Sequence, residues 1–270
     1  MDELSEKLVK KIKETFWEQK KKVPELWRFY WGVREGFATY EEASIFAVKL
    51  GEALSYSIRK NISADMLKDG VMTEELARAV LHSLLIENHE VISSALETMQ
   101  NAINAEFEIG VKAAHVNFNE NRASGLIKKY GSYNNYSDAE WVVGEPVVNF
   151  FQAIVDKAVE LNMEIQAKAG YFPTVTRFAV SGCCKWCSSL EGTYAYPVDK
   201  EVYRRHERCR CLVLFVSGKK VQDVHTKKLY QAASQKERND RIQKIGRYSI
   251  SATDGRINRI SRVLDAETQL

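Results

Sequence analysis

The residues of this chain that could do chemistry are gathered in one short segment. All five cysteines lie between Cys183 and Cys211, although the chain has 270 residues. The ligand-type residues follow the order Cys184-x2-Cys187, then 18 residues, then His206-x2-Cys209-x-Cys211. Two pairs of thiolate or imidazole ligands separated by a loop are typical of a tetrahedral zinc site. The spacing therefore predicts a structural Zn²⁺ ion that stabilises a small module, because metal binding contributes directly to folding.

The spacing leaves the fourth ligand open. The default ligand set is Cys184, Cys187, His206 and Cys209. Cys211 competes with Cys209 for the fourth position, unless it is simply buried where a strand begins. Cys183 is expected to be a spare thiol. Two alternatives remain: a reduced, metal-free thiol site, and a redox dithiol, for which the usual βαβ context is missing.

The composition is that of a folded and mainly helical protein. The chain is 45% apolar and 28% charged, with only four prolines and fourteen glycines, which favours long helices around a sizeable core. The net charge of +3 does not by itself demand a nucleic-acid partner, but residues 217–262 hold twelve Lys/Arg against four Asp/Glu. We expect no signal peptide and no membrane span, because no apolar run approaches about 18 residues. In reduced cytosol, clustered cysteines indicate metal or redox chemistry.

The elements before the cluster are predicted to be amphipathic helices. Residues 2–22 place apolar side chains every fourth position. Thr39–Ser57 and Thr73–Phe118 each begin with a threonine followed by a glutamate pair, which suits a helix start. Pro146 opens a further helix that runs through Ala169. The polar stretch Asn119–Ser137 is expected to be a loop or hinge.

Aromatic residues are concentrated in Leu26–Phe37, which includes Trp27, Tyr30 and Trp31. This group is either part of the core or a docking patch for another subunit.

After Gly170 the pattern changes to short strands. Thr174–Val180 alternates with β-branched residues, Cys211–Val216 predicts a second and buried strand, and Gly192–Pro197 is a strand or turn. The fold class is therefore mainly α, with a long bundle-like helical body and a small α+β C-terminal module, the cysteine-rich knob. We expect a helical N-terminal region at residues 1–130, a helix with the Cys/His module at 138–217, and a basic helical tail at 218–270.

The cluster and its surroundings resemble the phage Mu F-like head-morphogenesis, or minor capsid, proteins. The family signature is Cys-x2-Cys, Leu-x-Gly and His-x2-Cys-Arg-Cys, which Cys183–Pro197 and Val202–Cys211 match. Gly144–Phe150, Gln166–Gly170 and Val221–Lys228 look like the version found in phages and prophages of Gram-positive bacteria. The resemblance covers about residues 140–230. The doubled Cys183-Cys184 departs from the family pattern, which has one cysteine at that place.

The resemblance implies a virion component with no enzymatic activity. Such proteins are few per particle, associate with the portal and the inner capsid, and aid head assembly or genome packaging and delivery. The expected location is the capsid interior or portal vertex, and the host cytoplasm during assembly. Partners would be portal and capsid proteins, and the basic tail could contact packaged DNA through salt-sensitive phosphate contacts.

Other function classes stay open. A phage-encoded metal-dependent nuclease or toxin would use the cluster catalytically, but a general base is not evident beside the cysteines. A zinc-stabilised DNA-binding protein is the third class. A zinc deaminase would need His-x-Glu upstream and a proline before the Cys-x2-Cys pair, where this chain has Cys183. The remaining histidines are assigned no role: His82, His89, His115 and His225.

Overall fold

A computed structural model describes residues 3–180 and 182–218. Over these residues the α-helices are α1 (Glu3–Lys21), α2 (Pro24–Glu35), α3 (Tyr40–Asn61), α4 (Glu74–Glu106), α5 (Glu120–Tyr130), α6 (Tyr136–Ala139), α7 (Glu145–Lys168) and α8 (Lys185–Ser189). The strands are β1 (Thr174–Phe178), β2 (Gly192–Ala195) and β3 (Leu212–Val216). Short 3₁₀ turns lie at η1 (Ala64–Met66), η2 (Lys68–Gly70), η3 (Glu140–Val143) and η4 (Lys200–Tyr203).

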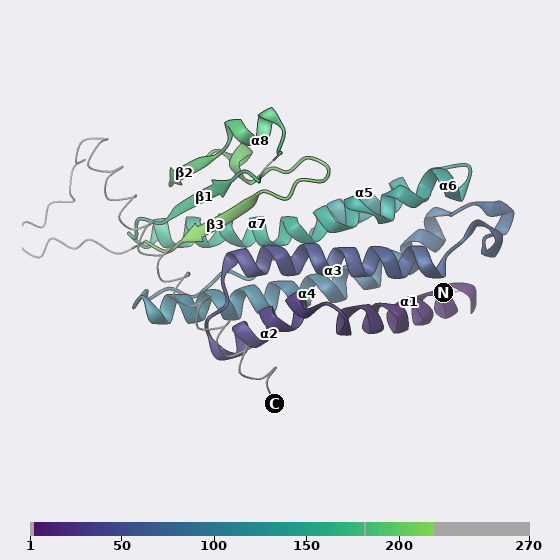
Figure 1. Cartoon of the computed structure of the whole chain (residues 1–270), viewed down its shortest axis with the longest axis horizontal. Helices are drawn as coiled ribbons and strands as arrows, with labels where there is room; N and C mark the ends of the chain where they lie inside the picture. Colours follow the sequence, from purple (N-terminus) through teal and green to yellow (C-terminus); the bar gives the residue numbers. More distant parts are fainter. Residues whose placement is uncertain (1–2, 181, 219–270) are drawn as a thin grey trace, which may run out of the picture.

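The long helices form the body of the molecule, with α3 and α7 packed closely together (Figure 1). The helix starts follow the predicted chemistry. Thr39 caps α3 in a reciprocal capping box with Glu42, and the Thr73 side chain accepts a hydrogen bond from the Leu76 N–H. Gly51 lies where α3 crosses α7, and a Cβ there would be 2.7 Å from the Val148 Cα. The close approach of the two helices therefore depends on glycine.

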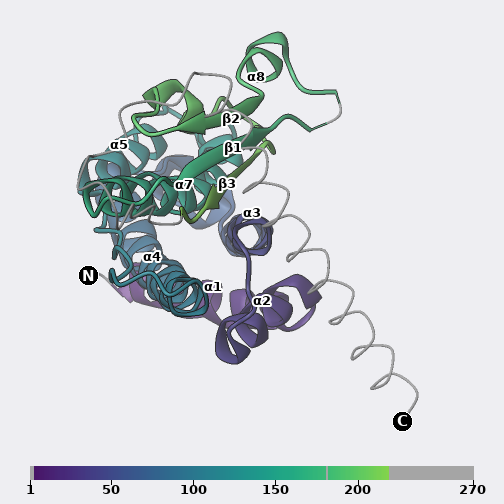
Figure 2. The same cartoon turned by 90° about the vertical axis from the view of Figure 1, so that its left-hand side faces the viewer.

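The three strands form an antiparallel sheet in the order β2-β1-β3. Strand β3 contacts α3 and α7, and the sheet lies over these helices in two perpendicular views (Figures 1 and 2). Val175, Val213 and Phe215 belong to the same buried apolar cluster as the helix side chains. The mainly α fold with a small cysteine-bearing β region is confirmed, and the sheet shares the core of the helical body.

The prediction of one helix from Thr73 to Phe118 was wrong at its end. Helix α4 stops at Glu106, and Glu108 adopts a left-handed φ of 55°. Polar side chains satisfy the backbone of the irregular segment that follows. The Asn104 side chain donates to the Val111 carbonyl at 2.8 Å, and the Asn162 Oδ1 accepts from the Ala114 N–H at 2.9 Å. Asn162 lies on α7, so the break depends on contacts distant in sequence.

The prediction of a loop over Asn119–Ser137 was also wrong, because this stretch contains α5 and the start of α6. Its polar residues form the exposed face of a short amphipathic helix. Ala123, Ile127 and Tyr130 are fully buried on the other face. The Asn119 side chain caps α5 by accepting from the Arg122 N–H at 2.9 Å.

The aromatic segment divides between the core and the surface. Trp31 packs edge-on against Phe37, with 4.8 Å between ring centroids, and Tyr30 packs against Phe46 at 5.0 Å. Trp27 is 45% exposed and Trp17 from α1 is 50% exposed, with their rings 6.4 Å apart. The half-buried Tyr30 joins α2 to α3, while Trp17 and Trp27 form an apolar patch on the surface.

Apart from Gly218, the predicted basic tail of residues 218–270 lies outside the described residues, as does its expected contact with DNA. In the described ranges, every helix is too short or too polar to cross a membrane.

Candidate metal centre

The first ligand pair is presented by the short helix α8. Cys184 is its N-cap, and its Sγ accepts a hydrogen bond from the Cys187 N–H at 3.4 Å. The turn therefore brings both sulfurs of the Cys-x2-Cys pair to one side of the chain. Cys184 is exposed, whereas Cys187 is fully buried.

The second pair comes from a tight turn between η4 and β3. The Cys209 N–H donates to the His206 carbonyl at 3.2 Å, and Arg208 within the turn has a left-handed φ of 59°. His206 Nδ1 lies 2.5 Å from the Glu207 carbonyl oxygen, which assigns the ring proton to Nδ1. His206 Nε2 then carries the lone pair, and it lies 3.5 Å from Cys184 Sγ and 3.0 Å from Cys187 Sγ.

The geometry brings all five predicted ligands into one cluster. In the described residues, their ligand atoms form two triads, each with all atoms within 4.8 Å of one another: Cys184, Cys187 and His206, and Cys187, Cys209 and Cys211. The triads share Cys187. Cys183 is half-buried beside the cluster and belongs to neither triad.

The distances suit tetrahedral zinc. Zn–S bonds of about 2.3 Å and Zn–N bonds of about 2.0 Å place two sulfurs about 3.8 Å apart, and a sulfur and nitrogen about 3.5 Å apart. Cys187 Sγ and Cys209 Sγ are separated by 3.8 Å, and Cys184 Sγ and His206 Nε2 by 3.5 Å. The 3.0 Å between Cys187 Sγ and His206 Nε2 is shorter and must lengthen when an ion binds. The donor set, its spacing and the histidine tautomer therefore fit a zinc ion. A fourth bond requires a side chain of the buried triad to move toward the exposed one.

Helix α7 holds in place the loop that carries His206, Cys209 and Cys211, here called the ligand loop. The contacts come from residues on successive turns of the helix. Asp156 forms a buried two-point ion pair with Arg205, at 2.5 and 2.8 Å, and Arg205 also donates to the Cys211 carbonyl at 2.6 Å. The Gln152 side-chain amide donates to the Cys209 carbonyl at 3.1 Å. Because Arg205 and Gln152 both hold carbonyls of ligand residues, the position of the loop is set by α7.

The electrostatics of the thiols differ across the cluster. Burial raises the pKa of Cys187 to about 12. The backbone N–H of Cys187 lowers the pKa of the exposed Cys184, because it stabilises the thiolate. Cys187 is therefore a neutral thiol at neutral pH in the absence of a metal, and a metal ion must displace its proton.

One residue of the centre was missed by the sequence analysis. Arg177 on β1 is fully buried beneath the cluster, and its Nη2 lies 3.6 Å from Cys187 Sγ and 3.8 Å from Cys209 Sγ. Its guanidinium also stacks on Trp186, 5.4 Å from the ring centroid. The available signal was its position in the alternating strand, two residues after the inward-facing Val175.

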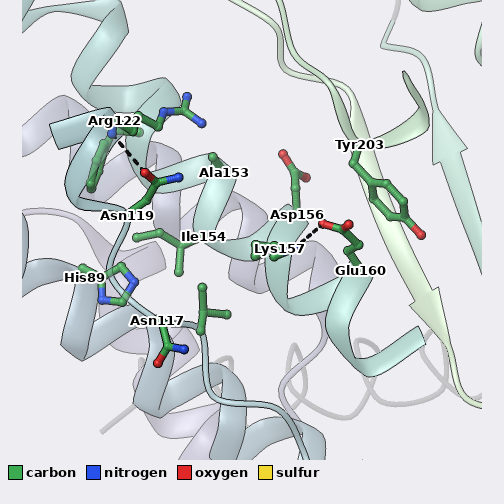
Figure 3. Close-up of a pocket in the computed structure, with 12 residues that line it drawn as sticks. His89, Asn117, Asn119, Arg122, Ala153, Ile154, Asp156, Lys157, Glu160 and Tyr203 are labelled. Carbon is green, nitrogen blue, oxygen red and sulfur yellow. Dashed lines mark hydrogen bonds and ion pairs between the residues drawn. The ribbon is translucent and has the colours of Figure 1, made fainter. Parts of the chain in front are cut away.

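A second candidate site is a cavity of about 280 Å³ beside α7 (Figure 3). The charged side chains that line it have partners: Lys157 pairs with Glu160, Asp156 pairs with Arg205, and Arg122 donates to the Asn149 carbonyl. His89 lines the cavity and is 3% exposed, and its Nε2 has no hydrogen-bond partner among the described residues. Burial lowers the pKa of His89, so its ring is neutral.

His206 also lines a groove of about 380 Å³ on the exposed side of the cluster. Arg122 and Lys129, two turns apart on α5, form one wall, and Trp141 contributes to the apolar surface. The half of the centre that faces solvent therefore opens beside a cationic and aromatic surface.

Comparison with known protein families, curated proteins and solved structures finds no match to this chain.

Proposed function

We propose that this chain is a structural protein of a phage particle, a minor capsid or head-morphogenesis protein with a zinc-stabilised module. The observation that carries the proposal is the meeting of the predicted ligands in two triads that share Cys187: Cys184, Cys187 and His206, and Cys187, Cys209 and Cys211. These are the residues on which the resemblance to the Mu F-like family rests. Cys211, the last residue of that signature, lies in the same cluster.

Zinc would act as a cross-link between two parts of the module. Cys184 and Cys187 would hold it from α8, and His206 with Cys209 or Cys211 from the loop before β3. The buried cysteines form a small cluster separate from the main core, with Ala179 and Cys183 packed against it, so such a clip supplies stability that this part of the module lacks. The Lewis acidity of the ion has no role in this proposal.

The helical body supplies surfaces for assembly. The exposed Trp17 and Trp27 form an apolar patch on α1 and α2, and exposed tryptophans are favoured at protein interfaces. We place the portal or inner capsid contacts on this body and the contact with packaged DNA on the basic tail. The proposed location is the virion, with the host cytoplasm during assembly.

The test is the presence of the chain in particles. Particles released by cells that carry its gene should contain a few copies each, measured by quantitative mass spectrometry. Cys184→Ser should lower the yield of infectious particles, because it removes an exposed ligand of the clip. Cys183→Ser is the matched control and should leave the yield unchanged.

Absence of the chain from purified particles would overturn the proposal. Metal-dependent cleavage of DNA by the purified chain, lost in His206→Ala, would support the nuclease alternative instead. That alternative draws on the exposure of His206 beside the groove that Arg122 and Lys129 line.

A further inference from the structure

Arg177 carries a buried charge that needs a counter-ion. Its side chain is fully buried, and a guanidinium stays protonated in proteins. In residues 3–180 and 182–218, no carboxylate lies within 4.0 Å of it, whereas the buried Arg205 is paired with Asp156. An uncompensated buried cation is strongly destabilising. The surroundings of Arg177 must therefore provide negative charge.

The contacts of the guanidinium show where that charge can reside. Nη1 donates to the carbonyls of Val202 and Arg204 at 2.6 and 2.9 Å, and these acceptors are neutral. Nη2 faces the sulfurs of Cys187 and Cys209 at 3.6 and 3.8 Å. Among the contacting atoms, the sulfurs alone can become anions, as thiolates.

We propose that Arg177 is the counter-cation of an anionic zinc–thiolate centre, and that it selects Cys209 rather than Cys211 as the fourth ligand. This inference rests on the metal centre of the proposed function. A zinc ion with three thiolates and one neutral imidazole has a net charge of minus one, which the charge of Arg177 neutralises. Residues that donate hydrogen bonds to metal ligands orient them and tune their affinity for the metal.

The choice of Cys209 follows from the direction of the guanidinium. Arg177 Nη2 contacts the Cys209 sulfur, while the Cys211 sulfur has a hydrogen bond from the backbone of Val180. The Cys209 sulfur therefore faces a full positive charge, which stabilises a metal-bound thiolate. The hydrogen bonds of Arg177 described above do not include the Cys211 sulfur.

The experiment measures the zinc affinity of the full chain by competition with a chromophoric chelator. Arg177→Met should weaken zinc binding about 10- to 100-fold, the usual effect of removing an outer partner of a metal ligand. Arg177→Lys should recover part of the loss, because it keeps the charge. Arg204→Met, an exposed arginine of the same loop, is the control and should bind zinc like the wild type.

A comparison of unfolding with and without zinc separates the charge from a purely structural role. Without zinc, the negative charge of the metal–thiolate centre is absent, so Arg177→Met should destabilise the zinc-loaded chain more than the zinc-free chain. Equal destabilisation of both forms with unchanged zinc affinity would overturn the inference. If the methionine variant does not fold, Arg177→Gln and Arg177→Lys allow the same comparison.

Cobalt substitution tests the ligand choice. Cys209→Ser should lose part of the sulfur-to-cobalt charge-transfer absorption and weaken binding, while Cys211→Ser should retain both. The opposite pattern would overturn the assignment of Cys209. A wild-type chain that binds no zinc would instead contradict the metal centre itself, so the two failures are distinguishable.

Discussion

Cys187 is the residue on which both halves of the cluster depend. It belongs to both ligand triads, it is fully buried, and its sulfur contacts Cys209, His206 and Arg177. Its burial has opposite effects on two states of the site. The neutral thiol is favoured without metal, whereas the same shielding from water strengthens a metal–thiolate bond once the proton has left.

The raised pKa of Cys187, about 12, predicts that zinc binding is strongly pH-dependent. At neutral pH the metal-free thiol is protonated, so each zinc ion that binds releases its proton. Zinc affinity should therefore rise with pH and fall as the pH falls, by about tenfold per pH unit for each proton displaced. Chelator competition at about pH 6 and about pH 8 measures this dependence. An affinity independent of pH would show that Cys187 does not bind the metal as a thiolate, and Cys183→Ser should keep the wild-type slope.

At the scale of elements, α7 serves two purposes. One face packs against α3 in the core, and Gln152 and Asp156 bind the loop that carries His206, Cys209 and Cys211. A second ion pair joins Glu145 at the start of the helix to Arg210 at 2.9 Å. The ligand loop, which has little regular structure of its own, thus takes its position from a long and rigid helix.

Asp156→Asn should destabilise the protein by about 3–5 kcal/mol, because it leaves the buried Arg205 without its counter-ion. Chemical denaturation measures the loss, and zinc affinity should fall with it because the loop loses its anchor. Glu160→Gln is the matched control on the same helix. It breaks the more exposed pair with Lys157 and should cost at most about 1 kcal/mol. Similar losses in the two variants would contradict the anchoring role of Asp156.

An element can be predicted from the sequence when the contacts that set its ends are local in the chain. The starts of α3 and α4 were predicted correctly because Thr39 and Thr73 cap their own helices within three residues. The end of α4 was not, because the Asn162 side chain that binds the following segment lies on α7. Helix α5 was missed because it is short and its buried face consists of Ala123, Ile127 and Tyr130 within a mainly polar sequence.

The candidate site shows the same limit. The types and spacing of the five ligand residues predicted their meeting, since short motifs carry their own geometry. Arg177 could not be paired with them from sequence. Its contact with Cys187 and Cys209 exists only because β1 passes beneath both ligand segments in the folded chain.

At the scale of the whole molecule, the contact between α3 and α7 joins the N-terminal helices to the Cys/His module. Both helices also contact β3, and one continuous core contains side chains of α1, α2 and the sheet. A change in the α3–α7 spacing should therefore lower the stability of the helices and of the sheet together.

Gly51→Ala tests this contact, because the added methyl group would meet the Val148 backbone at 2.7 Å. We expect a loss of about 1–3 kcal/mol in the free energy of unfolding, typical of overpacking. Gly125→Ala on α5 is the control, because no atom lies within 4 Å of its added methyl group. That variant should gain about 0.4–1 kcal/mol through the lower entropy of its unfolded chain. The same sign in both variants would contradict a close crossing of α3 and α7.

The uneven burial of the ligands also has a kinetic meaning. Cys187, Cys209 and Cys211 are closed off from water, whereas Cys184 and His206 face solvent. Exchange of a bound ion must therefore begin on the solvent side, where a chelator, a competing metal or an oxidant can reach Cys184 or His206 first. The buried sulfurs would be released last. The lifetime of a bound ion outside a reducing cell should therefore depend on how well Cys184 and His206 are shielded from solvent.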